Sequence, residues 1–377
     1  MTRLLAKLNL GISKMKYYII SGDPSGDIYG SRLINEIKRS DSKANIRFWG
    51  GDLMKESGGT LVKHYKDLAF MGFFEVLTNI FKILKNFSLC KNDIIKFSPD
   101  KIIFIDYPGF NLRIAKWAKK KKFKTFYYIS PQVWAWKENR VSTIKKYIDH
   151  MYVIMPFEKK FYKEKYNYEV QYYGHPLVDI IDESLKNKEI IKNVKPIIAI
   201  LPGSRKQEIN SILNKVLSIV KDFKKYQFII AGLNHINKNI YDEAVAKSGA
   251  SVKVLYNKTY DLLKNSNAAI VTSGTATLET ALIGTPQIVC YATNSLNMFL
   301  AKLFVKINFI SLVNLILNKE VVKELIQSDF NKEMIKTELN LILKGKRNQI
   351  QKDYKDLRNL LKGEDIESKI VNHIINN

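Results

Sequence analysis

Short apolar runs alternate along this chain with longer stretches in which apolar residues recur at helical spacing. The runs are rich in β-branched and aromatic residues, as buried strands are. Strands that alternate with helices predict an α/β fold of parallel sheets with helices on both faces. The runs cover residues 17–21, 46–50, 101–106, 125–129 and 151–155 in the first half, and 196–201, 227–232, 252–256, 268–273 and 286–291 in the second.

The alternation lapses between about 180 and 195, where polar and charged residues predominate. This break predicts a linker between two Rossmann-like domains, which we place at 16–185 and 186–345. Residues 1–15 are then an extension before the first strand, and residues 346–377 a polar, helical tail that is expected to lie on a surface. Ligands of such sheets bind at the loops that follow the carboxyl ends of the strands.

Length and cysteine usage narrow the class of protein. A chain of 377 residues is long enough for two hydrophobic cores. Cys90 and Cys290 are far apart and form no C-x-x-C pair, which argues against disulfides or cysteine-bound zinc and fits a reducing cytoplasm. The most apolar long stretch is interrupted by Lys302 and Lys306, so no membrane span is predicted, and no signal peptide is found.

The net charge is +25, from 61 Lys and Arg against 36 Asp and Glu. Such an excess predicts attraction to polyanions, either nucleic acid or an anionic membrane surface. The signatures of common nucleic-acid-binding modules do not occur, so no nucleic-acid partner is expected. A basic nucleic-acid-binding protein nevertheless stays the non-enzyme alternative.

The first predicted strand leads into a loop with three glycines. Gly22, Gly26 and Gly30 are four residues apart, which fits neither the G-x-G-x-x-G dinucleotide fingerprint nor a Walker loop. The loop either binds a polar group at a helix N-terminus or needs glycine only to turn. Ser25 is a candidate N-cap for this helix, and Asp27 suits its first turn.

A loop in the second half combines several groups that bind phosphate. Gly203, Ser204 and Arg205 lie between a predicted strand and a predicted helix. Backbone amides, a hydroxyl and a guanidinium therefore converge on one point, as in a diphosphate site. The strand context favours this interpretation over an ordinary exposed arginine.

The segment 271–286 repeats this arrangement of strand, small residues and helix. Its loop contains Ser273, Gly274 and Thr275, whose amides can face phosphate, and Glu279 follows one turn inside the helix. A carboxylate at that position can accept hydrogen bonds from the two hydroxyls of a ribose. Together the two loops predict that the second domain holds a nucleoside diphosphate.

Asp106 ends a predicted strand in the first half, and Asn111 and Arg113 follow at the start of a helix. If burial raises its pKa, this carboxylate can act as a general base. It can equally cap the helix or pair with Arg113, and the local sequence does not decide between these roles.

Two further segments carry aromatic residues or histidine. The segment 129–141 holds Trp134 and Trp136 among hydrogen-bonding groups that include Ser130. Aromatic faces suit sugar rings, although tryptophan more often serves packing. His175 precedes a proline and is interpreted as a structural histidine rather than a catalytic one.

The segment 68–87 has a helical stripe of apolar residues. Its aromatic content exceeds what one buried face needs, and Lys82 and Lys85 lie beside the aromatic residues. We therefore predict an interfacial helix that contacts lipid or acyl chains. The residues expected to make this contact are Phe70, Met71, Phe73, Phe74, Leu77 and Phe81.

Taken together, these segments resemble the lipid-A-disaccharide synthases, which are glycosyltransferases of the two-domain GT-B architecture. They occur in the family's order and cover most of the chain from about 16 to 327. The double-tryptophan segment is especially specific to this family. The matching segments are SGDPSGDIYGSRLI, LAFMGFFEVL, IDYPGFNLRIAK, YYISPQVWAWKENRV, MPFEKKFY, GHPLVD, LPGSRKQEI, SGTATLETAL and ISLVNLI.

The resemblance implies an inverting transfer of 2,3-diacylglucosamine from UDP to the 6-hydroxyl of 2,3-diacylglucosamine 1-phosphate. The products would be a β-1′,6-linked disaccharide phosphate and UDP, in lipid A biosynthesis. Asp106 would deprotonate the acceptor hydroxyl. No D-x-D motif occurs and no metal or other cofactor is expected, because Arg205 and helix dipoles would offset the charge of the departing diphosphate.

The resemblance also assigns the two domains to the two sides of a cleft. The acceptor side would include Ser25, Gly26, Asp27, Ser130 and Trp134. The apolar helix would let a cytoplasmic enzyme bind the inner membrane peripherally, and a homodimer is left open. UDP would be held by Gly203, Ser204, Arg205, Ser273, Gly274, Thr275, Glu279 and Asn314.

One departure from the family concerns the carboxylates. Many members have a second Asp where this chain has Gly109, so a role shared by two carboxylates would fall on Asp106 alone. The alternative enzymes are other GT-B proteins that use UDP-sugars, either a glucosaminyltransferase with a lipid-linked acceptor or an epimerase. The segment 129–141 and the apolar helix argue against both.

Overall fold

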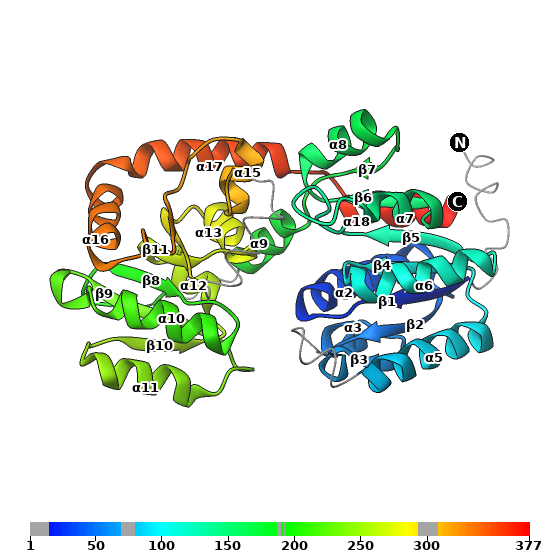
Figure 1. Cartoon of the computed structure of the whole chain (residues 1–377), viewed down its shortest axis with the longest axis horizontal. Helices are drawn as coiled ribbons and strands as arrows, with labels where there is room; N and C mark the ends of the chain where they lie inside the picture. The colour runs from blue at the N-terminus through cyan, green and yellow to red at the C-terminus, as the bar shows by residue number, and fades with distance from the viewer. Residues whose placement is uncertain (1–14, 69–79, 187–189, 192, 293–307) are drawn as a thin grey trace. The chain divides into compact units, whose positions relative to one another are not determined.

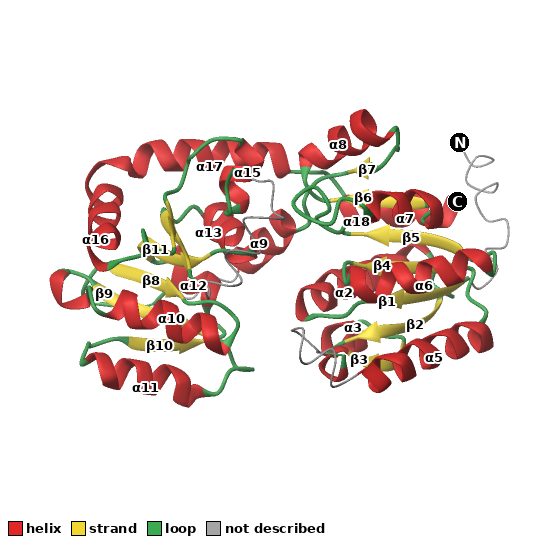
Figure 2. Ribbon diagram, in the orientation of Figure 1, coloured by secondary structure: helices red, strands yellow, loops and turns green. Residues whose placement is uncertain are grey.

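The computed structural model describes residues 15–68, 80–186, 190–191, 193–292 and 308–377. The chain divides into two compact units, which we call the N-unit and the C-unit. The N-unit contains the residues up to Pro176 together with Gly363–Asn377, and the C-unit is Leu177–Lys362. Each unit has its own parallel sheet with helices on both faces (Figures 1 and 2).

The N-unit is built on a seven-stranded sheet of order β3-β2-β1-β4-β5-β6-β7, in which all neighbours are parallel. The central strand β4 is buried along its length, as its apolar run KIIFI predicts. The strands are β1 (Lys16–Ile20), β2 (Asn45–Gly50), β3 (Thr60–His64), β4 (Lys101–Ile105), β5 (Lys124–Tyr128), β6 (His150–Val153) and β7 (Gln171–Tyr172). The helices are α2 (Pro24–Ser40), α3 (Asp52–Glu56), α5 (Ile80–Phe97), α6 (Pro108–Lys120), α7 (Arg140–Tyr147), α8 (Pro156–Tyr166) and α18 (Ile366–Asn376), with a 3-10 turn at Tyr65–Asp67.

The C-unit has a six-stranded parallel sheet of order β10-β9-β8-β11-β12-β13. Its strands are β8 (Ile197–Leu201), β9 (Gln227–Gly232), β10 (Lys253–Tyr256), β11 (Ser266–Thr272), β12 (Gln287–Tyr291) and β13 (Glu324–Ile326). Its helices are α9 (Leu177–Lys186), α10 (Lys206–Leu217), α11 (Lys238–Ser248), α12 (Thr259–Lys264), α13 (Thr275–Ile283), α15 (Leu312–Leu317), α16 (Lys332–Leu341) and α17 (Arg347–Leu361), with a 3-10 turn at Val220–Asp222 and a π-helical turn at Ile342–Lys346.

All ten predicted strands are present, and the structure adds three that the pattern missed. The three are β3, β7 and β13, and each lies at the edge of its sheet. β3 has no fully buried residue, and β7 and β13 have only two and three residues. An edge strand needs no continuous apolar run, because one side of it lacks a neighbouring strand.

The predicted linker is partly helical. Helix α9 covers Leu177–Lys186, so it includes the start of the polar stretch, and it buries Leu177, Val178 and Ile181 in the core of the C-unit. The boundary between the units therefore falls at 176/177 rather than at 185/186. The apolar face of α9 was hidden in the sequence by the charged residues of its other face.

The predicted tail is two helices that belong to different units. Helix α17 buries Ile350, Tyr354, Leu357 and Leu361, spaced by four, three and four residues, in the C-unit core. Helix α18 packs beside α2 in the N-unit (Figure 1). The tail is thus not a surface appendage, because the apolar stripe of each helix is buried.

The chain leaves and re-enters the N-unit at two glycines that touch. A Cβ atom on Gly174, which has φ +125°, would lie 2.7 Å from the Gly363 backbone. A Cβ atom on Gly363 would lie 1.9 Å from the carbonyl oxygen of Tyr173. Only residues without a side chain allow this approach of the two backbones. An ion pair of 2.5 Å between Arg32 and Glu367 then ties α18 to α2.

Candidate active site

The N-unit places two carboxylates at the switch point of its sheet. Strands β1 and β4 are neighbours, and the helices that follow them serve strands on opposite sides. The two helices therefore diverge from neighbouring strand ends, which is the usual ligand position in such sheets. Asp23 follows β1 and Asp106 follows β4. The loops touch, since a Cβ atom on Gly22 would lie 2.3 Å from the ring of Tyr107.

The backbone at Asp106 is strained and braced. Asp106 and Tyr107 have φ of +41° and +49°, a region that side chains other than glycine seldom adopt. The side-chain amide of Asn111 donates to the carbonyl oxygens of Asp106 at 2.7 Å and Ile105 at 3.2 Å. The hydroxyl of Tyr127 donates to the Asp106 carbonyl at 2.5 Å. These bonds hold the carboxylate in a fixed position.

Burial raises the pKa of Asp106 from its ordinary value of 3.8 to about 7. Repulsion by Asp23 raises it further, whereas the Tyr107 amide and Arg140 act in the opposite direction. A carboxyl that titrates near neutral pH can accept a proton from a substrate hydroxyl. The other two roles that the sequence left open are absent: α6 has no side-chain N-cap, and no bond joins Asp106 to Arg113 among the described residues.

The N-cap of α2 is Asp23 and not Ser25 as predicted. The Asp23 carboxylate accepts the Gly26 amide at 2.6 Å, and burial is the main cause of its raised pKa. Ser25 lies inside the helix and is exposed. Gly26 is buried against Ser21, whose hydroxyl oxygen would be 2.3 Å from a Cβ atom on Gly26. The glycine therefore serves packing of the loop.

Asp27 lies in the first turn of α2, as predicted, and its carboxylate is bound by backbone amides of another segment. Its carboxylate is buried and accepts the amides of Gly51, Leu53 and Met54 at 2.8, 3.1 and 3.0 Å. Asp27 therefore caps the N-terminus of α3, whose own N-cap residue Gly51 has no side chain to do so.

Ser130 and Trp134 are also committed to the scaffold. The Ser130 hydroxyl is buried and bonds to Tyr162 at 3.0 Å. The Trp134 indole donates to Glu158 at 3.2 Å. Burial raises the pKa of Glu158 to about 7. Sequence analysis missed Glu158, although the order Pro-Phe-Glu is a signal for a first-turn carboxylate, and Glu158 accepts the Met155 amide at 3.0 Å.

The C-unit repeats the switch-point arrangement with other residues. Strands β8 and β11 are neighbours, so the loops 202–205 and 273–274 meet. Gly203 has φ +104°, and a Cβ atom there would lie 3.4 Å from a methyl group of Thr272 and 2.8 Å from Glu208. Ser204 is exposed beside it. The structure thus brings together the two loops that the sequence assigned to one anion.

Arg205 occupies the N-cap position of α10 and is 66% exposed. Its guanidinium contacts Glu208 at 2.8 Å. An anion that binds here meets the positive end of the α10 dipole and this guanidinium. The pairing of Arg205 with Glu208 was not predicted from the sequence, and an anion at this position would compete with Glu208 for the guanidinium.

The N-terminus of α13 supplies the other half of this site. Gly274 has φ +148°, and a Cβ atom there would meet no atom within 4 Å. Thr275 begins the helix and is exposed, so the first amides are open to an anion. The Ser273 amide does not face an anion as predicted, because it donates to the Cys290 carbonyl at 3.0 Å. The Ser273 hydroxyl donates to the Ile310 carbonyl at 3.0 Å.

Glu279 is half-buried one turn inside α13. The hydroxyl of Tyr260 donates to one carboxylate oxygen at 2.7 Å. Burial raises the pKa of Glu279, and the bond from Tyr260 lowers it. The second oxygen has no hydrogen bond among the described residues, so it can accept one from a ligand hydroxyl.

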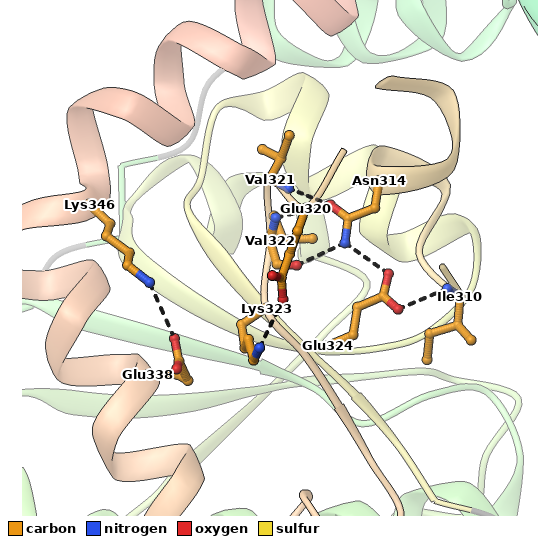
Figure 3. Close-up of polar contacts among 9 residues, drawn as sticks. All are labelled: Ile310, Asn314, Glu320, Val321, Val322, Lys323, Glu324, Glu338 and Lys346. Atoms are coloured by element: carbon orange, nitrogen blue, oxygen red, sulfur yellow. Dashed lines mark hydrogen bonds and ion pairs between the residues drawn. The ribbon is translucent and has the colours of Figure 1, made fainter. Parts of the chain in front are cut away.

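Asn314 has a structural role instead of the predicted contact with UDP. Its amide group is fully buried and donates to the carbonyl of Val322 and to Glu324, at 2.8 and 2.9 Å. Its side-chain oxygen accepts the amides of Val321 and Val322 (Figure 3). No donor of this side chain is left for a nucleotide.

The Asn314 network does position a residue of the site. Glu324, which the sequence did not reveal, accepts the amide of Ile310 at 2.9 Å (Figure 3). It also accepts the amide of Ser311 at 2.9 Å. The Ile310 carbonyl in turn accepts the Ser273 hydroxyl. Asn314 and Glu324 therefore fix the loop against which Ser273 is held.

Of the predicted interfacial helix 68–87, the structure describes Leu68 and residues 80–87, and the latter form the start of α5. Phe81 and Leu84 are 83% and 57% exposed, and Lys82 and Lys85 are exposed beside them. None of the helices in the described ranges is both long and apolar enough to cross a membrane. The other residues predicted to contact lipid lie outside the described residues: Phe70, Met71, Phe73, Phe74 and Leu77.

Two smaller expectations concern titratable side chains. His175 is buried, and burial lowers its pKa to about 3, so it is a neutral structural histidine as predicted. Cys90 and Cys290 are buried free thiols. Within the described parts of the chain, no three metal-ligating side chains gather.

Comparison with solved structures identifies the architecture. The chain is similar to the UDP-GlcNAc 2-epimerase of Neisseria meningitidis bound to UDP-GlcNAc, with a TM-score of 0.68 and 15% identity over 96% of this chain and 100% of that one. It is also similar to the kitacinnamycin glycosyltransferase, with a TM-score of 0.66 and 9% identity over 95% and 98%. At these identities the likeness shows the GT-B fold alone.

Comparison of sequences identifies the family. The family model described as Lipid-A-disaccharide synthetase matches residues 17–374. The lipid-A-disaccharide synthase of Syntrophus aciditrophicus is 36% identical over 358 residues, which cover 91% of this chain and 92% of that protein. The Coxiella burnetii enzyme is 36% identical over 341 residues, or 88% and 90%. The chain belongs to the lipid-A-disaccharide synthase family and is a glycosyltransferase of lipid A disaccharide synthesis.

Proposed function

We propose that the enzyme transfers 2,3-diacylglucosamine from UDP to the 6-hydroxyl of 2,3-diacylglucosamine 1-phosphate with inversion at the transferred carbon. The observation that carries this proposal is the braced Asp106 carboxyl, which has its pKa raised to about 7 at the N-unit switch point. A family of this activity requires a base for the acceptor hydroxyl, and Asp106 is the carboxyl best suited to that task.

In the proposed step, the Asp106 carboxylate removes the proton of the acceptor 6-hydroxyl. The oxygen forms a bond to C1 of the donor sugar, and the bond between C1 and the diphosphate oxygen breaks. The electron pair of that bond leaves with UDP. Attack opposite the leaving group gives inversion.

The C-unit is proposed to hold UDP. The amides at the start of α13, with the N-terminus of α10 and Arg205, would bind the diphosphate and offset its growing charge. Glu279 would accept the ribose hydroxyls. We propose that these groups suffice without a metal ion, so that activity should persist when EDTA is present.

Membrane contact is proposed to run through α5. Its exposed Phe81 and Leu84 provide apolar contact, and the neighbouring lysines attract anionic lipid. Phe81→Ser with Leu84→Ser should reduce binding to vesicles that contain phosphatidylglycerol. Leu360→Ser is the matched control, because Leu360 is 49% exposed on α17. Equal binding by both variants would place the membrane contact elsewhere.

The decisive test measures UDP release with both lipid substrates in detergent and EDTA. We expect turnover by the wild type that requires both lipids, and a fall of about 10²- to 10⁴-fold for Asp106→Asn, the range typical of a lost general base. Asp356→Asn, at an exposed aspartate of α17, is the control. Binding of UDP without turnover of these lipids would reject the proposed substrates, and normal activity of Asp106→Asn would reject the proposed base.

A further inference from the structure

Among the arginines that the structure describes, two in the N-unit have no hydrogen bond or ion pair to a described residue. Arg113 lies on α6, and Arg140 begins α7, which packs against α6. Neither guanidinium makes a hydrogen bond or ion pair to any residue that the structure describes. The other described arginines each have such a partner: Arg32 with Glu367, Arg39 with Glu36, Arg47 with Asp93, Arg205 with Glu208, Arg347 with the Asn267 carbonyl and Arg358 with Asp182.

A lysine and an exposed indole complete this cluster. The ammonium group of Lys137 lies 4.3 Å from the ring centroid of Trp136, and the Arg140 guanidinium lies 5.7 Å from it. The Trp136 side chain is 46% exposed, so the cations are held at a surface that a ligand can reach. Lys137 likewise has no ion pair to a described residue. Cation–π contact alone offsets only part of the repulsion between the cations.

The positive charges of this cluster repel one another. Burial lowers the pKa of Arg140, and Arg113 lowers it further by repulsion, while Tyr127 and Asp106 act in the opposite direction. Burial and then Arg140 lower the pKa of Lys137. Cations that are close together and have no ion-pair partner among the described residues favour an anion in their midst. Two guanidinium groups suit phosphate because each can donate two hydrogen bonds to it.

We propose that Arg113, Arg140 and Lys137 bind the 1-phosphate of the acceptor. This inference rests on the proposed function. Tyr127 links the cluster to the base, because its hydroxyl donates to the Asp106 carbonyl. In a pyranose ring, C1 and C5 flank the ring oxygen, so the 1-phosphate and the 6-hydroxymethyl group extend from the same edge. An acceptor that presents its 6-hydroxyl to Asp106 therefore directs its phosphate toward neighbouring residues.

The site also gives a reason for selecting a phosphorylated acceptor. The donor of the reaction has no free phosphomonoester, since its phosphates are esterified with uridine and the sugar. A cluster that requires a phosphomonoester dianion therefore distinguishes the two substrates, which share the same acylated sugar.

The test compares two acceptors, 2,3-diacylglucosamine 1-phosphate and the same lipid without phosphate. The double variant Arg113→Gln with Arg140→Gln should raise KM for the phosphorylated acceptor by about 10- to 100-fold, as expected for lost hydrogen bonds to a charged group. KM for the donor should stay at its wild-type value. Because Arg140 also lowers the pKa of Asp106, rates are compared at about pH 8.5, where the Asp106 carboxylate prevails with and without this arginine, and the rate with the dephosphorylated acceptor should then match the wild type. Arg39→Gln is the control, since Arg39 is 72% exposed at the end of α2 and pairs with Glu36.

A binding experiment tests the site independently of turnover. Wild-type protein should broaden and shift the ³¹P NMR signal of glucosamine 1-phosphate, and the double variant should not. If the variant loses activity equally with both acceptors, or retains wild-type discrimination and ³¹P broadening, the phosphate site is wrong. If the wild type binds glucosamine 1-phosphate through these arginines but turns over neither lipid, the proposed function fails while the phosphate site stands.

Discussion

The two switch points have the same topology and opposite chemistry. In the N-unit, the loops after β1 and β4 carry the carboxylates of Asp23 and Asp106. In the C-unit, the loops after β8 and β11 carry Gly203, Gly274 and Arg205, next to two helix N-termini. The comparison teaches that the sheet fixes where a ligand binds, while the loop residues decide whether the position accepts a proton or an anion.

The two loops also differ in how the backbone is supported. Positive φ at Gly203 and Gly274 costs little, because glycine has no Cβ atom. Positive φ at Asp106 and Tyr107 is unfavourable and needs bracing. In this family member the bracing comes from Asn111 and Tyr127. The loop of the proposed base therefore depends more on its neighbours than the two glycine loops do.

The largest effect that tests this contrast is the pH dependence of activity. If Asp106 with its pKa raised to about 7 is the base, kcat/KM should rise with pH and level off above about 7. Below that value it should fall about tenfold per pH unit, because only the carboxylate is active. UDP binding, measured by calorimetry, should depend on pH in the same way for the wild type and for Asp106→Asn, because the groups proposed to hold UDP lie in the C-unit. A flat rate profile over pH 5.5–8 contradicts the assignment of the base.

The same carboxyl should lower the free energy of unfolding as pH rises, whereas activity should increase as pH rises. Its native pKa lies above the ordinary value of 3.8, so the native state binds the proton more tightly than the unfolded chain. This contribution to stability is complete below pH about 4 and is lost as pH rises through about 7. The free energy of unfolding of Asp106→Asn should therefore fall less between pH 5 and 8 than that of the wild type, as urea titrations can measure.

The next effect in size concerns the bracing of the catalytic loop. Asn111→Ala removes the donor to the carbonyls of Asp106 and Ile105 and to that of Ile20. Because Asn111 is fully buried, we expect the free energy of unfolding to fall by about 2–4 kcal/mol. Turnover of the folded variant should drop while UDP binding is retained. Asn92→Ala, at an exposed position of α5, is the control.

The sequence predicted the parts of the fold and site that local pattern decides. Central strands are continuous apolar runs, and the loop with Arg205 follows such a run directly. The roles of Asp27 and Asn314 were not predictable in this way. Asp27 caps a helix that begins 25 residues later, and Asn314 bonds to a strand edge at Val322 and Glu324. A polar residue beside a site looks the same in sequence whether its partner is a ligand or a distant loop.

The cluster of Arg113, Arg140 and Lys137 illustrates the same limit of local sequence pattern. Arg113 and Arg140 are separated by 27 positions, and the packing of α6 against α7 brings them together. The sequence analysis considered Arg113 only as a partner of Asp106, its near neighbour in the chain. That an arginine lacks a counter-ion can be seen only when its surroundings are known.

The smallest predicted effect concerns Glu208, which pairs with Arg205 in the C-unit. Glu208 holds the Arg205 guanidinium at 2.8 Å, and both side chains lie at the surface. Exposed ion pairs of this kind are worth roughly 0–1 kcal/mol. Glu208→Gln keeps the size of the side chain and removes its charge, so affinity for UDP should rise by about two- to fivefold. Calorimetry at two salt concentrations should show the gain shrinking as salt increases. If affinity falls instead, Glu208 orients Arg205 toward the diphosphate rather than competing with it, and the two switch points would then both depend on bracing by a neighbouring side chain.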